Sequence, residues 1–298
     1  MPTPDPFRVF DPPALRRHRT RAAAAAGAGD FLFAASAERI AETLGEIKRR
    51  FPRALDLGSR GGLLARQLSG LDGIEHLIGA DTVPAFAPDL VLEPEALPFA
   101  PGCFDLVVSN LLLHWTNDLP GALLQIRQIL KPDGLFLAAL FGGETLTELR
   151  EALIEAEAEI ENGASPRVSP FADARDLAGL LQRAGFALPV AESDRLEATY
   201  ADAFGLMRDL RLMGETNATV ERRRGFTRRT TLMRAAEIYR ARHAGADGRI
   251  HARFEIITLT AWAPDAGQPK PLRPGSATTR LADALDTEER SSGNKPTP

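Results

Sequence analysis

The sequence predicts an α/β fold, a doubly wound and mostly parallel sheet. Three observations support this prediction. A short strand-like run, Ala54–Leu57, leads into a glycine-rich turn, Gly58–Gly62, and a helical pattern follows directly. The continuous apolar run Phe104–Asn110 is typical of a strand in a sheet that is covered on both faces. The apolar spacing from Leu119 to Lys131 predicts an amphipathic helix that covers this sheet.

Composition indicates a globular protein with one main domain. The 298 residues are 44% hydrophobic and 26% charged, which is enough to bury one sizeable core. The net charge of -4 gives no long-range attraction to nucleic acid, so DNA is not expected as a partner. The single cysteine, Cys103, forms no internal disulfide and indicates a reducing compartment. No apolar run reaches the length of a membrane span, so a soluble protein is expected.

The first 50 residues are expected to form an N-terminal helical segment outside the sheet. The basic stretch Arg16–Arg21, followed by alanines, has the composition of a mitochondrial transit peptide. Asp5 and Asp11 argue against that interpretation and favour a surface helix over the rim of the domain. We therefore expect a cytoplasmic protein of bacterial type, or a protein of the mitochondrial matrix if the source is eukaryotic.

The chain after the glycine turn predicts a thin edge of the sheet. Glu75–Asp81 has the pattern of a strand that ends in an acid, and Asp89–Glu93 has the pattern of a short strand. Only seven residues, 82–88, connect the two. A crossover between parallel strands usually takes about 10–12 residues or more. This edge of the sheet is therefore expected to be irregular.

The remaining chain is expected to complete the core, 51–142, and to add a helical cap with the final sheet strands, 143–264. Gly142-Gly143 stand before the cap, as a hinge or as a point of close strand–helix packing. Residues 265–298 have little to bury and are expected to be a disordered tail. Beyond the core, helices are predicted near 144–161, 173–184, 202–213 and 229–242, and strands near 186–191 and 254–262.

The glycine-rich turn is the expected ligand site, because α/β proteins bind ligands at the carboxyl ends of their strands. The absence of a Walker-type Gly-Lys-Ser/Thr argues against ATP. Arg60 stands where a dinucleotide fingerprint has its second glycine, which makes NAD the weaker alternative. Asp56 ends its strand with a carboxylate that repels pyrophosphate and attracts an ammonium group. Asp81, 25 residues further on, is suited to binding ribose hydroxyls.

Taken together, these motifs resemble the S-adenosylmethionine-dependent methyltransferases of the Rossmann-like class. The resemblance implies a Rossmann-like sheet with one antiparallel edge strand, supplied by 249–263, and S-adenosylmethionine as the cofactor. The chain departs from the family pattern at Arg60, where a glycine is usual, and in the short 82–88 connection. The matching stretches, within about 50–142, are Asp56-x-Gly58-x-x-x-Gly62, Asp81, Glu93–Phe99, Phe104–Asn110 and Leu130–Gly134.

The same resemblance implies roles for individual residues around the cofactor. Arg60 either reaches the cofactor carboxylate through a charge-assisted hydrogen bond or is a solvated surface arginine. The implied positions are Asp56 at the amino group, Gly58 and Gly62 at the close backbone approach, Asp81 at the ribose, Glu93 on the adenine side and Asn110 facing the methyl sulfonium.

Four further stretches are similar to a narrower family, the methyltransferase-like assembly factors of respiratory complex I and their bacterial relatives. This similarity implies hydroxylation of an arginine in a complex I subunit, which is then the protein partner. A more distant similarity, to the biotin-pathway enzyme that methylates a malonyl thioester, leaves a small-molecule or thioester methyltransferase as an alternative. A non-catalytic assembly chaperone is the third possible function. The four stretches are Leu113–Pro120, Phe141–Leu146, Ser165–Phe171 and Leu212–Asn217.

His114, Trp115 and Asn110 are the candidates for the substrate side of the site. A neutral imidazole accepts a proton near pH 7, and an indole packs over a guanidinium. The alternative is that His114 and Trp115 are structural. Methyl transfer depends mainly on alignment of the reactants and demands no base. The five histidines lack the spacing of a two-histidine, one-carboxylate iron site, so no metal site is predicted, and the oxidant and the oligomeric state stay open.

Overall fold

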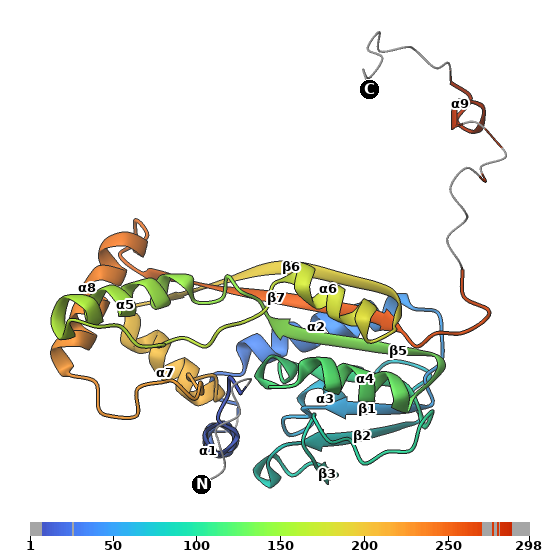
Figure 1. The fold of residues 1–298 in the computed structure, drawn as a ribbon, viewed down its shortest axis with the longest axis horizontal. Helices are drawn as coiled ribbons and strands as arrows, with labels where there is room; N and C mark the ends of the chain where they lie inside the picture. The colour runs from blue at the N-terminus through green and yellow to red at the C-terminus, as the bar shows by residue number, and fades with distance from the viewer. Residues whose placement is uncertain (1–7, 26, 270–275, 277–278, 280, 288–298) are drawn as a thin grey trace. The chain divides into compact units, whose positions relative to one another are not determined.

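A seven-stranded sheet organises the first of two units, residues 1–264, in the computed structural model (Figure 1). The structure describes residues 8–25, 27–269, 276, 279 and 281–287. The second unit, residues 265–298, includes one short helix, α9 (Leu281–Ala284). Most of the predicted disordered tail lies outside the described residues, so that part of the domain division stays a prediction.

The strand order is β3-β2-β1-β4-β5-β7-β6. Strands β1 to β5 run parallel, and β7 lies antiparallel between β5 and β6. The predicted Rossmann-like sheet, mostly parallel with one antiparallel strand toward an edge, is confirmed. The segment 249–263 supplies this strand, β7, but the prediction that it forms the edge itself is wrong, because β6 pairs along its outer side. The strands are β1 (Arg53–Leu57), β2 (His76–Asp81), β3 (Leu90–Val91), β4 (Phe104–Asn110), β5 (Leu130–Phe141), β6 (Ala187–Tyr200) and β7 (Ile250–Trp262).

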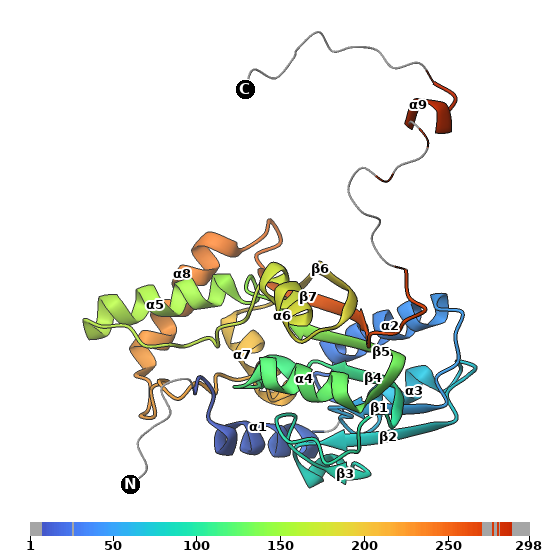
Figure 2. The same ribbon diagram turned by 45° about the vertical axis from the view of Figure 1, so that its right-hand side comes forward.

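Helices cover both faces of the sheet, as the apolar run of β4 predicts (Figures 1 and 2). Leu106 and Val108 of β4 pack with the buried side of α2 and α3, and Val107 between them packs with α4 and α6 on the other face. The helices of the first unit are α1 (Pro12–Ala24), α2 (Phe31–Glu46), α3 (Leu63–Leu68), α4 (Leu119–Ile129), α5 (Thr147–Glu161), α6 (Ala174–Arg183), α7 (Ala203–Met213) and α8 (Arg229–His243). None of the described helices is long and apolar enough to cross a membrane.

The β2–β3 edge is as thin as the short connection predicts. Strand β3 has two residues, and a single 3-10 turn, Pro84–Phe86, replaces the crossover helix. Helix α1 packs against this turn. The carboxyl ends of β1 and β2 are therefore covered by the N-terminal segment.

Gly142 follows β5 and lies against Glu255 of β7. A Cβ at Gly142 would overlap the Glu255 carboxyl group, which accepts hydrogen bonds from Glu144 N (2.9 Å) and Ser193 Oγ (2.5 Å). Close packing therefore accounts for this glycine without a hinge. Beyond it, α5, α7 and α8 gather at the end of the sheet toward which the parallel strands point (Figure 1).

Candidate functional site

The glycine turn after β1 approaches the segment after β4 closely. Gly58 has a φ of +98°, and a Cβ there would lie 2.8 Å from Leu112 Cβ. Gly62 caps α3 with a φ of +72°, also in the left-handed region. These two positions hold a tight turn at the carboxyl edge of the sheet, where the sequence predicts the ligand.

We expect Gly58→Ala to destabilise the protein by about 1–3 kcal/mol, because the new methyl group clashes with Leu112 in an unfavourable backbone conformation. Chemical denaturation measures the loss. Gly70→Ala is the matched control, since nothing lies within 4 Å of a Cβ built at Gly70. Equal stability of the two variants would contradict the close contact.

Asp56 is fully buried at the end of β1, and neither carboxylate oxygen has a hydrogen-bond partner. Burial, and then the nearby charge of Asp81, raise the pKa of Asp56 to about 8. An unpaired buried carboxyl group is costly, and a cation placed beside it would offset that cost. The position is thus a candidate site for an ammonium group, as the sequence predicts.

Further buried polar atoms without a partner lie around Asp56. Asn110, at the end of β4, donates through Nδ2 to Phe33 O at 2.9 Å, but its Oδ1 has no partner. Buried polar groups are nearly always hydrogen-bonded in native proteins, so a cluster of exceptions indicates a ligand site. The other members, from the glycine turn, are Ser59 Oγ and Arg60 Nη1.

Arg60 is buried, so the alternative of a solvated surface arginine is wrong. Its backbone lies in the left-handed region, with a φ of +44°. Its guanidinium lies 3.6 Å from the centre of the Phe33 ring and donates to Asp30 Oδ1 (2.7 and 3.0 Å) and Met213 O (2.9 Å). Arg60 therefore ties the glycine turn to the loop before α2 and to the end of α7. Its contact with a cofactor carboxylate stays a prediction.

The two acids predicted for the ribose and the adenine side are both ion-paired with α1. Arg19 contacts Asp81 through Nε (3.2 Å) and Nη2 (2.6 Å), and both side chains are buried. One turn earlier, Arg16 contacts Glu93 through Nε (3.0 Å) and Nη2 (2.6 Å). The sequence predicts a rim helix at α1 but not these contacts, for which the spacing of Arg16 and Arg19 is the available signal.

The space left beside these ion pairs is small. A pocket of about 170 Å³ lies between α1 and the segments that follow β3 and β4, with Arg19, Glu93 and Trp115 in its wall. Ligand pockets usually have about 300–1,000 Å³. Helix α1 thus restricts the cleft in this structure. The residues predicted for the cofactor nevertheless all lie along this edge of the sheet, namely Asp56, Gly58, Gly62, Asp81, Glu93 and Asn110.

His114 and Trp115 meet Glu215, a residue that sequence analysis does not single out. Glu215 Oε2 accepts from Trp115 Nε1 at 2.9 Å and lies 3.2 Å from His114 Nε2. Phe141 and Phe171 complete an aromatic cluster, with ring centres 4.8 and 5.5 Å from that of His114. His114, Trp115 and Phe141 are buried and Phe171 is partly buried, and the cluster fixes one carboxylate oxygen of Glu215.

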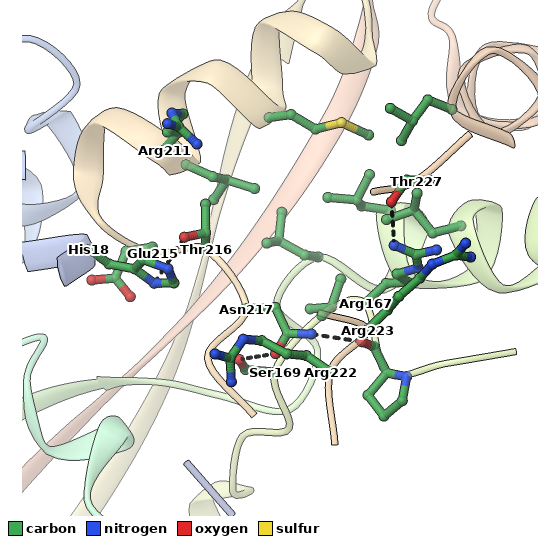
Figure 3. A pocket seen from close by; sticks show the side chains of 18 of the residues that line it. His18, Arg167, Ser169, Arg211, Glu215, Thr216, Asn217, Arg222, Arg223 and Thr227 are labelled. Atoms are coloured by element: carbon green, nitrogen blue, oxygen red, sulfur yellow. Dashed lines mark hydrogen bonds between the residues drawn. The ribbon is translucent and has the colours of Figure 1, made fainter. Parts of the chain in front are cut away.

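Glu215 also lines a pocket of about 470 Å³ beside this cluster (Figure 3). Leucines of α5, α7 and α8 form its apolar part, and Phe171 belongs to its wall. His18, Arg211, Glu215 and Thr216 lie on one side of the pocket, opposite Arg167, Arg223 and Thr227. Among the described lining residues, Glu215 supplies the acidic side chain. The leucines of the apolar part are Leu146, Leu149, Leu153, Leu210 and Leu232, and Val168 and Met207 add to them.

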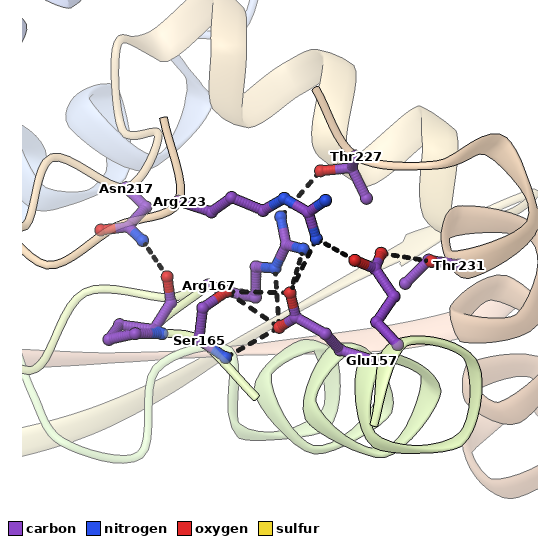
Figure 4. A network of polar contacts seen from close by, with 9 residues as sticks. Glu157, Ser165, Arg167, Asn217, Arg223, Thr227 and Thr231 are labelled. Carbon is purple, nitrogen blue, oxygen red and sulfur yellow. Dashed lines mark hydrogen bonds and ion pairs between the residues drawn. The ribbon is translucent and has the colours of Figure 1, made fainter. Parts of the chain in front are cut away.

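A buried network anchors the far side of this pocket (Figure 4). The Glu157 carboxylate of α5 accepts from Arg167 Nη2 (2.6 Å) and Ser165 N (2.8 Å), and Arg223 contacts both Glu157 and Glu161. Burial alone would raise the pKa of Glu157, but the hydrogen bonds from Arg167 and Ser165 outweigh it and lower the pKa to about 2. The network joins α5 to the loops that carry the pocket wall.

No three His, Cys, Asp or Glu side chains within the described part of the chain are grouped so as to hold a metal ion. Of the histidines, His114 lies in the aromatic cluster and His18 in the pocket wall. Cys103 is a free, partly buried thiol.

Comparison with known proteins agrees with this architecture. Residues 18–189 match the methyltransferase domain family. The chain is 40% identical to the mitochondrial arginine-hydroxylase NDUFAF5 of Rattus norvegicus, over 89% of this chain and 80% of that protein. It is 31% identical to a malonyl-[acyl-carrier protein] O-methyltransferase of Gallionella capsiferriformans, over 90% of this chain and 96% of that protein.

Among solved structures, the YcgJ protein of Bacillus subtilis has a similar fold, with a TM-score of 0.52, 16% identity and coverage of 78% of this chain and 99% of that one. The predicted family and fold are confirmed by these matches. The chain therefore belongs to the methyltransferase domain family and, within it, to the enzyme family of the arginine-hydroxylase NDUFAF5.

Proposed function

We propose that this enzyme binds S-adenosylmethionine at the carboxyl ends of β1, β2 and β4 and modifies an arginine side chain of a protein substrate. The observation that carries the proposal is Glu215, a buried carboxylate held by His114 and Trp115 at the wall of the 470 Å³ pocket. The names of the relatives support arginine as the target and hydroxylation as the reaction. The resemblance of the sequence to complex I assembly factors supports a complex I subunit as the substrate.

The residues around the glycine turn fit S-adenosylmethionine. Asp56 has two buried, unpartnered oxygens for the ammonium group, and Asn110 Oδ1 is a further unpartnered acceptor. Gly58 and Gly62 let the backbone approach the ligand, and Asp81 and Glu93 offer carboxylates for the ribose and the adenine side. When bound, S-adenosylmethionine would supply, for the methylation alternatives, a methyl group already activated by its sulfonium, whereas hydroxylation would take its oxygen atom from a separate oxidant. The chain then has to bind, align and exclude water.

Binding in this mode requires the arginines of α1 to release Asp81 and Glu93. Arg19 holds both carboxylate oxygens of Asp81, which in the proposed complex accept from the ribose hydroxyls instead. Arg16 contacts one carboxylate oxygen, Oε1, of the more exposed Glu93. The two arginines thus occupy the ribose and adenine positions of the free enzyme, and a small displacement of α1 exchanges them for the cofactor.

We expect Arg19→Ala to bind S-adenosylmethionine several-fold more tightly than the wild type, because Asp81 no longer has to leave an ion pair. The free variant should be less stable, since breaking a buried ion pair leaves an uncompensated charge that costs about 3–5 kcal/mol. Titration calorimetry and thermal unfolding measure the two effects. Arg17→Ala, a neighbouring arginine of the same helix, is the control. Unchanged affinity in Arg19→Ala would mean that the Arg19–Asp81 pair persists in the complex.

On the substrate side, Glu215 is suited to a guanidinium. Its Oε2 is fixed by His114 and Trp115, and the carboxylate lines the pocket, where a second oxygen is available to a cationic ligand. Phe171 adds an aromatic ring to the same wall. A carboxylate beside aromatic rings is a common way to bind a guanidinium group, through charge-assisted hydrogen bonds and cation–π contact. His114 and Trp115 act here by positioning Glu215.

Helices α5, α7 and α8 serve as a cap over the substrate. They enclose the pocket that contains Glu215, and the Glu157 network holds the loops between them. The cap excludes water from the aligned substrate. Cofactor binding should increase the protection of residues 144–161 against hydrogen exchange, and equal exchange with and without cofactor would make the cap a rigid wall.

The relative that acts on a malonyl thioester supports a second candidate, methylation of a carrier-bound acid. The arginines in the pocket wall favour an acidic ligand of this kind. A non-catalytic assembly chaperone is the third candidate. Since the relatives named above include a mitochondrial protein, we propose the mitochondrial matrix for a eukaryotic source and the cytoplasm for a bacterial one.

Deletion of the gene followed by intact-mass analysis of the complex I subunits separates these functions. The proposed reaction predicts one subunit that lacks the mass of an oxygen atom, restored by the wild-type gene. Loss of a methylene mass would indicate arginine methylation. Biotin auxotrophy with normal subunit masses would indicate the thioester enzyme, and unassembled complex with normal masses would indicate the chaperone.

A further inference from the structure

The charges in the wall of the 470 Å³ pocket are unbalanced. Three of its arginines have acidic partners, but two do not. Arg167 pairs with Glu157, Arg222 with Asp11 and Arg223 with Glu161. The other two are Arg21, in the last turn of α1, and Arg211, in the last turn of α7.

No carboxylate of the described residues forms an ion pair with Arg21 or Arg211. Arg21 Nη2 donates only weakly to Thr216 Oγ1, at 3.4 Å, and Arg21 Nε is buried without a partner. Burial, and then the charge of Arg211, lower the pKa of the Arg21 guanidinium. Both guanidinium groups line the same pocket, Arg21 partly buried and Arg211 exposed, and their like charges disfavour each other.

The surroundings of this pair are polar but supply no negative charge of their own. Thr216 Oγ1 lies 3.0 Å from His18 Nδ1 and so joins α1 to the loop after α7. Burial, and then the charges of Arg21 and Arg222, lower the pKa of His18 to about 4, so its imidazole is neutral at pH 7. Glu215 is the next acidic side chain along the wall, and His114 and Trp115 already bind it.

We propose that Arg21 and Arg211 form an anion-binding subsite that takes an acidic side chain of the protein substrate, near the arginine that Glu215 binds. The proposal rests on the proposed function of Glu215 and adds a requirement for the sequence of the substrate. A guanidinium pair binds a carboxylate through charge-assisted, bidentate hydrogen bonds. Arg211 and Glu215 lie on the same side of the pocket (Figure 3). A peptide with an arginine and a nearby acid therefore places its arginine against Glu215 and its acid against the neighbouring arginine pair.

The test uses the full-length enzyme and synthetic peptides with one arginine. Each peptide carries either glutamate or glutamine at one position within three residues of that arginine. We expect the wild type to bind the best glutamate peptide about tenfold more tightly than its glutamine counterpart. Arg211→Gln should remove this preference and leave the glutamine peptide unaffected. Arg224→Gln, which removes an exposed arginine outside this pocket, should keep it.

The outcomes separate this subsite from the function of Glu215. Glu215→Gln should weaken every arginine peptide but retain the preference for glutamate. If replacing the peptide arginine has no effect while the glutamate preference survives, the proposed arginine site fails and the anion subsite stands. Equal binding of glutamate and glutamine peptides by the wild type overturns the subsite, as does a preference that persists in Arg211→Gln. If the wild type binds inorganic phosphate but shows no preference for glutamate peptides, the Arg21–Arg211 pair binds a phosphate group. That result would overturn the proposal that it binds an acidic side chain of the substrate.

Discussion

Replacing Asp56 by asparagine is expected to weaken S-adenosylmethionine binding by about 10- to 150-fold, the worth of a hydrogen bond to a charged group at about 1.5–3 kcal/mol. Both oxygens of Asp56 are buried and unpartnered, so the cofactor ammonium would be their partner. Titration calorimetry measures the loss. Asp89→Asn, at an acid that accepts from Gly79 N on the thin edge of the sheet, is the control and should keep its affinity.

The raised pKa of Asp56 predicts that cofactor binding releases a proton. With a pKa of about 8, Asp56 is protonated in the free enzyme at pH 7, and it has to ionise beside an ammonium group. Cofactor binding should therefore release a proton at pH values below about 8 and should tighten as the pH rises toward that value. Calorimetry in buffers of different ionisation enthalpy detects the release, and Asp56→Asn should abolish it. Binding without proton release would exclude Asp56 as the ammonium partner.

Asp56 also makes the free enzyme less stable at high pH. The folded-state pKa lies above the unfolded value of 3.8, so the folded state holds a proton that the unfolded state has lost. The Asp56 contribution to the free energy of unfolding is therefore largest below pH 3.8 and falls as the pH rises to about 8. In Asp56→Asn, stability should vary less with pH over this range.

Replacing Glu215 by glutamine is expected to reduce modification of the substrate by about 30-fold or more, because loss of one member of a buried charge pair costs about 2–5 kcal/mol. Glutamine still accepts from Trp115 Nε1 through its amide oxygen, so the aromatic cluster should remain folded. The measurement is the modified fraction of the substrate subunit, by intact mass, in a deletion strain that expresses each variant.

Two controls make this result specific to the substrate side. Glu151→Gln removes an exposed carboxylate of α5 and should leave modification at the wild-type level. Glu215→Gln itself should bind S-adenosylmethionine as well as the wild type, since Glu215 is not among the residues proposed for the cofactor. Full modification by Glu215→Gln would refute the assignment of Glu215 to the arginine.

Prediction from the sequence was most successful where neighbouring residues decide the structure. The glycine turn, helix α3 and strand β4 all lie where the sequence places them, because their signals are local apolar spacing and glycine at left-handed positions. The thin β2–β3 edge is likewise a consequence of chain length, since 82–88 is too short for a crossover helix. The carboxyl-edge position of Asp56, Asp81 and Asn110 then follows from parallel pairing.

The tertiary structure decided which charges meet, and no local pattern carries that information. Arg19 reaches Asp81 across 62 positions of sequence, Arg60 reaches Asp30 across 30, and His114 reaches Glu215 across 101. An arginine has the same sequence signature whether it is solvated or buried against a carboxylate, because its charge is satisfied equally by water and by a distant acid. The sequence by itself therefore determined the sheet, the turn and the edge at which a ligand lies. Only packing of α1 and α7 against that edge determined that Arg19 covers Asp81, that Arg60 turns inward and that Glu215 lines the 470 Å³ pocket.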